Sequence, residues 1–205
     1  MLGRAMSIRT LFATPFYEDK IADPALLAEL EHSCRTLSVD DRAGRNWCRE
    51  NAYPGYTSYA SLNDLPMRDP AFATLQKKID AHVKRFVEAA HLDLGGRRLR
   101  QNSLWVNVLK PGGGHTNHIH PHSVVSGTVY VSVPEGAGRL KIEDPRLPLM
   151  MASPPRRADA PEEVQQFIYA QPAPGTIFLW ESWLRHEVQA SRAKSDRISI
   201  SFNYS

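Results

Sequence analysis

The chain has 205 residues, of which 42% are hydrophobic, and this suits one globular domain with a proper core. The formal net charge of +3 is too small to indicate a nucleic-acid-binding protein, and no apolar stretch approaches the roughly 20 residues of a membrane span. Residues 1–7 lack the apolar core of a signal peptide, and the two cysteines, Cys34 and Cys48, form no CxxC pair. We therefore expect a cytoplasmic protein without disulfides.

The first half of the sequence predicts an edge strand and two helices. An apolar run at 8–17 contains Pro15, which an edge strand tolerates. Asp23-Pro24 and Asp69-Pro70 each combine a helix N-cap with proline in the first turn, and apolar residues follow both at helical spacing. The second helix is expected to end at 91–95, where glycines follow. Residues 39–66, between the helices, are polar and glycine-bearing and predict an irregular crossing.

From residue 99 onward the apolar pattern changes to the period of two that is typical of β-strands. Short strands separated by turn signals indicate an antiparallel sandwich or barrel. The predicted strands are 103–109, 126–133, 138–143, 167–171, 176–180, 186–189 and 197–204.

Four of the eight histidines fall within eight residues: His115, His118, His120 and His122. Neutral imidazole is the commonest transition-metal ligand in proteins. On a strand, His118 and His120 would point to the same side, because side chains alternate. A third histidine from a neighbouring strand would complete a facial set and leave open positions on the metal. The cluster therefore predicts a metal site rather than a histidine-rich loop.

Two residues near the C-terminus complete the predicted site. In a double-layer jelly roll, the strand that carries His186 and the His-x-His strand would lie on facing sheets and meet at the barrel mouth. Arg197 is expected one hairpin beyond His186 on a neighbouring strand, with Ser199 on the same face. A buried arginine needs a partner, so Arg197 predicts a bidentate contact with an anionic co-substrate.

Residues 145–163 contain five prolines and predict a loop between two strands. Loops of this length are usually functional or disordered. One hypothesis is that the segment lies over the barrel mouth and becomes ordered when substrate binds. The alternative is a solvent-exposed excursion without a role.

Together these patterns resemble the 2-oxoglutarate-Fe(II) oxygenase family of bacteria and phages. The resemblance rests on Leu11-Phe12-Ala-Thr-Pro15-Phe16, Trp105-x-Asn107, His118-x-His120-Pro-His-Ser-x-x-Ser126-Gly127-x-x-Tyr130, Pro174-Gly175, Ser182-Trp183-Leu184-x-His186 and Arg197-Ile-Ser199-Ile-Ser-Phe-Asn203. It implies a mainly β fold with flanking helices. The implied domain spans 1–205, with a double-stranded β-helix (jelly roll) at 99–205 and a helical N-terminal part at 1–98 packed on it.

The same resemblance implies an Fe(II)- and 2-oxoglutarate-dependent dioxygenase that hydroxylates a small molecule or a protein side chain. The low net charge and the lack of a long apolar stretch predict no nucleic-acid or membrane partner, and a homodimer stays open. The implied metal ligands are His118, His120 and His186. The implied co-substrate residues are Arg197 and Ser199 at the distal carboxylate of 2-oxoglutarate, with Asn107 and Tyr130 lining the same pocket.

One position departs from the wider superfamily, which has His-x-Asp or His-x-Glu where this chain has His118-x-His120. An all-histidine set would change the charge on the iron. His115 and His122 are alternative ligands. Asp144 could supply a carboxylate if its loop folds back toward the metal.

Two other classes of protein fit parts of the pattern. A cupin-like metal-binding protein with non-oxidative or no catalytic activity would explain Gly112 before His118, although Val124 and Val125 stand where its glutamate is expected. A zinc hydrolase is superficially similar in its His-x-His-Pro-His run, but the aspartate-histidine pair is missing. Metal analysis combined with a 2-oxoglutarate turnover assay discriminates among these classes.

Overall fold

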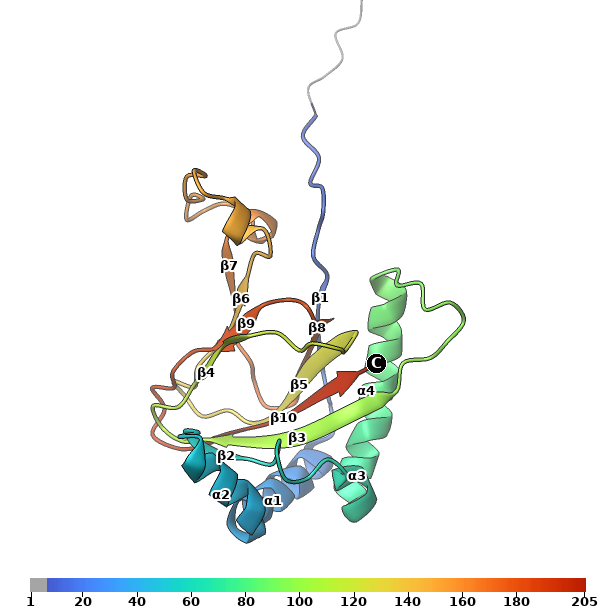
Figure 1. The fold of residues 1–205 in the computed structure, drawn as a ribbon, viewed down its shortest axis with the longest axis vertical. Coiled ribbons are helices and arrows are strands. Elements are labelled where there is room, and N and C mark those ends of the chain that lie inside the picture. The colour runs from blue at the N-terminus through green and yellow to red at the C-terminus, as the bar shows by residue number, and fades with distance from the viewer. Residues whose placement is uncertain (1–6) are drawn as a thin grey trace, which may run out of the picture.

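The structure is a computed structural model and describes residues 7–205. Residues 1–6, which are part of the stretch examined for an export signal, lie outside the described residues. Two antiparallel sheets face each other, and helices cover the outer face of the larger sheet (Figure 1). This arrangement confirms the predicted jelly roll with flanking helices.

The large sheet contains six strands in the described part of the chain. In chain order they are β1 (Phe16–Lys20), β2 (Gly55–Thr57), β3 (Gln101–Leu109), β5 (Val125–Ser132), β8 (Thr176–Glu181) and β10 (Arg197–Tyr204). Their order in the sheet is β1-β8-β5-β10-β3-β2. Strands β1 and β2 come from the N-terminal part, so this part extends the large sheet at both edges as well as covering it.

The small sheet contains four shorter strands among residues 7–205, in the order β4-β9-β6-β7. They are β4 (His115–His118), β6 (Leu140–Glu143), β7 (Phe167–Ala170) and β9 (His186–Val188). The helices are α1 (Pro24–Asp40), α2 (Arg42–Glu50), α3 (Leu65–Arg68) and α4 (Pro70–Ala89).

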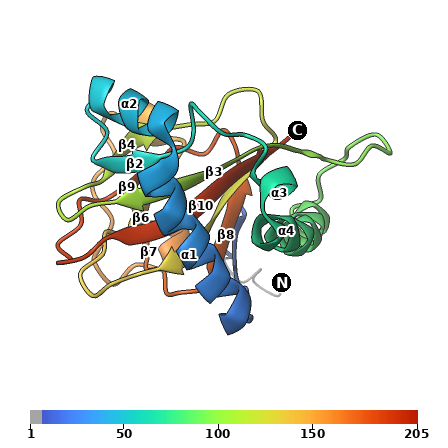
Figure 2. The same ribbon diagram turned by 90° about the horizontal axis from the view of Figure 1, so that it is seen from below.

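Side chains along β10 point alternately into the hydrophobic core on the helix side and into the space between the two sheets. Ile198, Ile200 and Phe202 pack on the helix side, in one cluster with residues of α1 and α4. The residues between them, Ser199 and Ser201, face the small sheet. Figure 2 shows α1 running across the outer face of the large sheet, with α4 beside it.

The two long helices form where the sequence predicts them. Asp23 Oδ1 accepts a hydrogen bond from Leu26 N at 3.1 Å to cap α1, and Asp69 Oδ1 accepts one from Ala71 N at 2.8 Å to cap α4. Both helices carry proline in the first turn. Their apolar stripes are buried against the large sheet.

In the first half, the predicted edge strand forms at an edge of the large sheet but with other bounds, and the prediction for 39–66 is wrong. The run at 8–17 forms no strand before Phe16, so the edge strand lies later than its apolar pattern suggested. The crossing at 39–66 is not irregular, because it contains α2 and β2. Helix α2 is capped by Asp41, whose Oδ1 accepts from Gly44 N at 3.0 Å, but it buries only Gly44 and Cys48. Such a narrow buried face gives little apolar signal.

The predicted arrangement of the C-terminal strands is also wrong. Strands β4 and β9 are neighbours in the small sheet and do not lie on facing sheets. Strands β9 and β10 belong to different sheets, so residues 189–196 cross between the sheets instead of closing a hairpin. Arg197 therefore lies on the sheet that faces the strand of His186.

The proline-rich segment joins β6 to β7 and projects beyond these two strands (Figure 1). It is a loop with two short 3-10 turns, Leu147–Leu149 and Glu162–Val164. No helix within residues 7–205 has the length and apolar character to cross a membrane.

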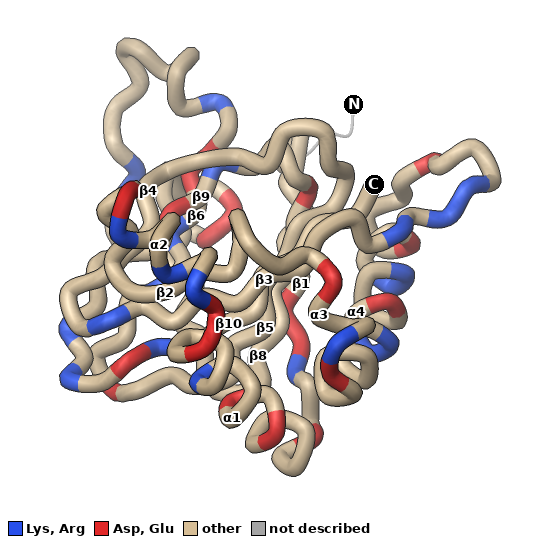
Figure 3. The backbone as a smooth tube through the Cα atoms, turned by 60° about the horizontal axis from the view of Figure 1, so that its bottom comes forward, with Lys and Arg blue, Asp and Glu red and all other residues tan. Residues whose placement is uncertain are grey.

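Charged residues are sparse on the central strands and frequent on helices and loops (Figure 3). Strands β3 and β5 carry none, and β10 carries only Arg197. An arginine in this position is unusual enough to require an explanation from its surroundings.

Candidate metal centre

An irregularity in β4 brings two histidines to the same side of the strand. His115 lies opposite Val188 and His118 opposite His186, so the register shifts between them. In a regular strand, residues three apart point to opposite faces, whereas a bulge re-aims the chain. Strand β4 ends at His118, so His120 reaches the interior from the following loop and not from the strand that the sequence predicted.

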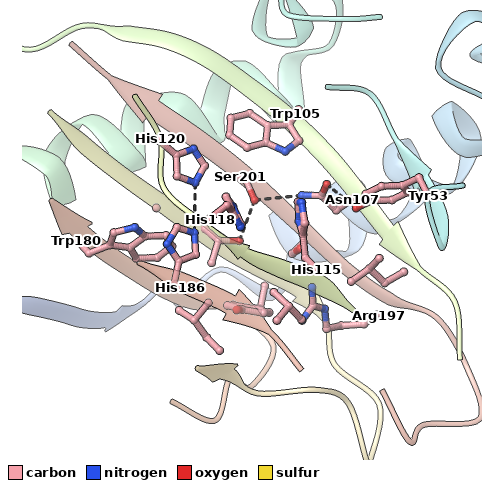
Figure 4. A pocket seen from close by; sticks show the side chains of 17 residues that line it. Tyr53, Trp105, Asn107, His115, His118, His120, Trp180, His186, Arg197 and Ser201 are labelled. Atoms are coloured by element: carbon pink, nitrogen blue, oxygen red, sulfur yellow. Dashed lines mark hydrogen bonds between the residues drawn. The ribbon is translucent and has the colours of Figure 1, made fainter. Parts of the chain in front are cut away.

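The side chains of His118, His120 and His186 converge on one point (Figure 4). Each offers a ring nitrogen, and these nitrogens lie within 4.8 Å of one another. Nε2 of His120 is 3.3 Å from Nε2 of His186. This is a histidine triad of the kind that a single transition-metal ion requires.

Backbone carbonyls fix the orientation of two of the three rings. Nδ1 of His118 lies 2.7 Å from the Thr116 oxygen, and Nδ1 of His186 lies 2.9 Å from the Leu184 oxygen. A carbonyl oxygen only accepts, so Nδ1 donates in both rings and Nε2 keeps its lone pair for a metal.

Burial keeps the triad in the neutral form that binds metal. Desolvation lowers the pKa of His186 to about 3 and that of His120 to about 4, and the neighbouring imidazoles add to both effects. Burial also lowers the pKa of His118. The three imidazoles are therefore uncharged near neutral pH and need not lose a proton to a metal.

The loop that carries His120 is tied to the sheets by a buried hydrogen-bond network of Ser126, Ser182 and Asn203. The backbone N–H of His120 donates to the Ser182 carbonyl at 2.9 Å. The Ser182 and Ser126 hydroxyls are 2.7 Å apart, and Ser126 Oγ donates to Asn203 Oδ1 at 2.8 Å. All three residues belong to the motifs that carry the family resemblance, but the sequence predicted no role for them.

Arg197 lies at the other end of the cavity that contains the triad (Figure 4). Its side chain is 3% exposed, its Nη1 donates to the Gly138 carbonyl at 3.4 Å, and its Nε has no hydrogen-bond partner. Within residues 7–205, Arg197 forms no ion pair, and its guanidinium lies 5.4 Å from the centre of the Tyr130 ring. An unpaired buried cation favours an anionic ligand.

The other predicted co-substrate residues lie side by side on three strands. Ser199 is opposite Asn107 on β3 and opposite Tyr130 on β5. Asn107 is already engaged, because its Oδ1 accepts from Tyr53 Oη at 3.1 Å and from Thr57 Oγ1 at 3.0 Å. Asn107 therefore holds Tyr53 in the cavity wall. The sequence missed Tyr53, since nothing in its polar surroundings marks it.

The residues considered as alternative metal ligands lie in different places relative to the cavity. His122 is exposed and lies outside the cavity, and both carboxylate oxygens of Asp144 pair with Arg146 at 2.9 and 2.8 Å. His115 does line the cavity but is not part of the triad. None of the described residues that line the cavity is acidic, and none comes from 145–163.

A family model described as "Putative 2OG-Fe(II) oxygenase" matches residues 103–203. The match covers all three triad histidines and Arg197. The similarity noted at Leu11–Phe16 lies outside it. A comparison with curated protein sequences finds no match.

Solved structures with this fold include several enzymes. A prolyl-4-hydroxylase from Pseudomonas putida is 16% identical over 93% of this chain and 92% of its own, with a TM-score of 0.62. The epimerase SnoN, in complex with Fe3+, alpha ketoglutarate and nogalamycin RO, is 15% identical over 94% and 79%, with a TM-score of 0.63. HygX from Streptomyces hygroscopicus, with nickel and 2-oxoglutarate bound, is 14% identical over 94% and 82%, with a TM-score of 0.56. At these identities the likeness shows the fold.

Proposed function

We propose a function on the premise that residues 103–203 belong to the 2OG-Fe(II) oxygenase family, which makes the chain an oxidoreductase dependent on iron and 2-oxoglutarate. In our proposal His118, His120 and His186 hold Fe(II), and Arg197 with Ser199 holds the distal carboxylate of 2-oxoglutarate. One observation carries this assignment: three neutral ring nitrogens converge in the same cavity as a buried arginine that has no acidic partner in the described residues.

The donor set fits such a pair of ligands. Imidazole nitrogens suit ferrous iron, and three protein ligands leave coordination positions open. A guanidinium offers a planar pair of donors to a carboxylate, and Nε of Arg197 is free to take part. With iron and 2-oxoglutarate bound, the centre would supply the chemistry by which O2, as the oxidant, hydroxylates a substrate C–H bond while 2-oxoglutarate is converted to succinate and CO2.

The protein's own residues would orient these ligands and exclude water. The bonds from Nδ1 of His118 and His186 to backbone carbonyls hold both rings in place. Trp180 packs edge-on against His186, with ring centres 4.6 Å apart, and Trp105 lies beside His120 at 5.9 Å. Burial raises the pKa of Tyr130, so its phenol stays uncharged next to Arg197.

The primary substrate is proposed only by class, as a small molecule or a protein side chain. The family match favours the oxygenase over the cupin-like and zinc-hydrolase alternatives. We also propose that residues 1–205 act as one domain, because α1 and α4 share one hydrophobic cluster with the large sheet. We keep as predictions the cytoplasmic location and the absence of a nucleic-acid partner. Whether the protein forms a homodimer stays open.

Anaerobic reconstitution with Fe(II) followed by a 2-oxoglutarate turnover assay tests the proposal. Wild-type protein is expected to bind one iron per chain and, once O2 is admitted, to convert 2-oxoglutarate and O2 to succinate and CO2. His122→Ala, which changes an exposed histidine close to the triad in sequence, is the matched control and should keep both properties. A wild-type protein that binds iron but neither binds nor consumes 2-oxoglutarate would contradict the proposed function.

A further inference from the structure

We propose that His115 binds the co-substrate and not the metal, by donating a hydrogen bond to 2-oxoglutarate in the space between the triad and Arg197. This inference rests on the proposed function, because it assigns a further residue to the same cavity. It also resolves the question of whether His115 belongs to the metal ligands.

The bulge in β4 places His115 in the cavity. Its ring lies next to that of His118, with the ring centres 4.5 Å apart and the planes 26° from parallel. The cavity lining includes both His115 and Arg197, and Figure 4 shows His115 between His118 and Arg197. A ligand that extends from the triad to Arg197 would therefore pass the His115 ring.

The position of the ring argues against a role as a metal ligand. The ligand atoms of His118, His120 and His186 all lie within 4.8 Å of one another, and His115 is not a member of this group. The His115 ring lies instead beside that of His118, on the side toward Arg197 (Figure 4).

The ring nitrogens of His115 are free to meet a ligand. Among residues 7–205 no hydrogen bond is formed by the His115 side chain, whereas Nδ1 of His118 and Nδ1 of His186 are held by carbonyls. Polar groups in a cavity wall are normally hydrogen-bonded, and a neutral imidazole always offers one N–H. A carboxylate or keto oxygen of 2-oxoglutarate would supply the acceptor.

The position of the ring is fixed before any ligand binds. Tyr53 contacts His115 edge-on at 6.0 Å between ring centres, and Asn107 holds the Tyr53 hydroxyl at 3.1 Å. His115 thus lies between the Tyr53 and His118 rings. A donor held in this way binds its acceptor without a large loss of side-chain entropy.

Calorimetry with Mn(II) and 2-oxoglutarate tests the assignment without relying on activity. Mn(II) is titrated first, to count metal sites, and 2-oxoglutarate is then titrated into the Mn(II)-loaded protein. His115→Ala should keep one Mn(II) per chain and raise the Kd for 2-oxoglutarate about tenfold or more, since a hydrogen bond to a charged group is lost. His115→Gln, which retains an N–H donor, should recover part of the affinity, and His122→Ala should match wild type.

The outcomes separate the two proposals. Loss of Mn(II) from a folded His115→Ala protein would overturn the assignment, because His115 would then be a metal ligand. An unchanged Kd for 2-oxoglutarate in His115→Ala, beside normal binding in wild type, would overturn it as well and leave the proposed function intact. Wild-type protein that binds Mn(II) but no 2-oxoglutarate would overturn the proposed function and the assignment together.

Discussion

The two walls of the cavity differ in the length and pairing of the strands that form them. The wall that carries Arg197 and Ser199 belongs to the large sheet, where β10 pairs along its length with β3 and β5. The opposite wall carries the histidine triad on β4, β9 and the loop that follows β4, and these strands have only four and three residues. We call these the anion wall and the metal wall.

The two walls keep their side chains in place in different ways. On the anion wall, cross-strand register and a helix-backed core position every residue. The metal wall packs on a smaller hydrophobic cluster that includes Leu140, Ile142 and Leu184. It relies in addition on individual hydrogen bonds, from ring nitrogens to carbonyls and through the network of Ser126, Ser182 and Asn203. We therefore expect a substitution in one wall to leave ligand binding at the other wall unchanged. We also expect the metal wall to gain more order from its ligand.

His186→Ala should have the largest effect, on the metal wall alone. No other histidine lies near this position in sequence, and the ring is one of the three that offer a nitrogen to the metal. Iron occupancy measured by elemental analysis should fall to background, while the urea midpoint of the metal-free protein stays close to that of wild type. Full iron occupancy in the variant would show that the triad is assigned wrongly.

Phe202→Ala tests the support behind the anion wall. The side chain is fully buried on the helix side of β10. Its truncation should lower the free energy of unfolding by about 3–5 kcal/mol, as for other buried phenylalanines. Urea unfolding gives this value, and the folded fraction should still bind one metal ion per chain. Reduced stoichiometry in folded protein would mean that the walls are coupled.

Arg197→Ala should weaken 2-oxoglutarate binding by about 2–5 kcal/mol, the range for a buried charge pair that loses one partner. Metal binding should not change, because Arg197 lies on the other wall. Arg197→Lys should recover little, since an ammonium cannot reproduce the planar fork. Anaerobic calorimetry measures these affinities, and equal 2-oxoglutarate affinity in wild type and Arg197→Ala would refute the role.

Ser182→Ala should loosen the loop of His120 and lower metal affinity by roughly tenfold, a typical cost of removing a group that supports a metal ligand. Ser123→Ala, in the same loop, is the control, since its side chain takes part in no hydrogen bond within residues 7–205 and should leave the affinity unchanged. Competition with a chelator of known affinity measures both. If the two variants behave alike, the network does not position His120.

The segment at 145–163 should give the smallest effect. Arg156 and Arg157 are exposed, so trypsin can cleave there. If the segment closes over the cavity, cleavage should slow a few-fold when metal, 2-oxoglutarate and substrate are present. Equal rates with and without these ligands would support an exposed excursion without a role.

Local patterns in the sequence predicted much of this structure. The bounds of β10 at 197–204 agree with the prediction, because isoleucine and serine alternate there without interruption. Both capped helices form because aspartate and proline act on adjacent backbone groups. His118, His120 and His186, which the family resemblance implies as metal ligands, lie together, and their role as ligands stays a prediction.

The errors concern properties that depend on tertiary structure. Alternation does not reveal which sheet a strand joins, so β9 and β10 were predicted to be neighbours. The bulge in β4 depends on pairing with β9 and leaves no mark on the residues between His115 and His118. Tyr53 enters the cavity wall through α2 and β2, whose narrow buried faces gave no periodic signal.

The unpaired charge of Arg197 has a thermodynamic consequence for the protein without its ligand. A guanidinium that is removed from water and has no carboxylate partner lowers the stability of the folded state. A dianionic ligand that supplies the missing charge relieves this cost only in the folded chain, so its concentration shifts the folding equilibrium. The supply of co-substrate in the cell would then influence how long each molecule stays folded, and with it the amount of protein available.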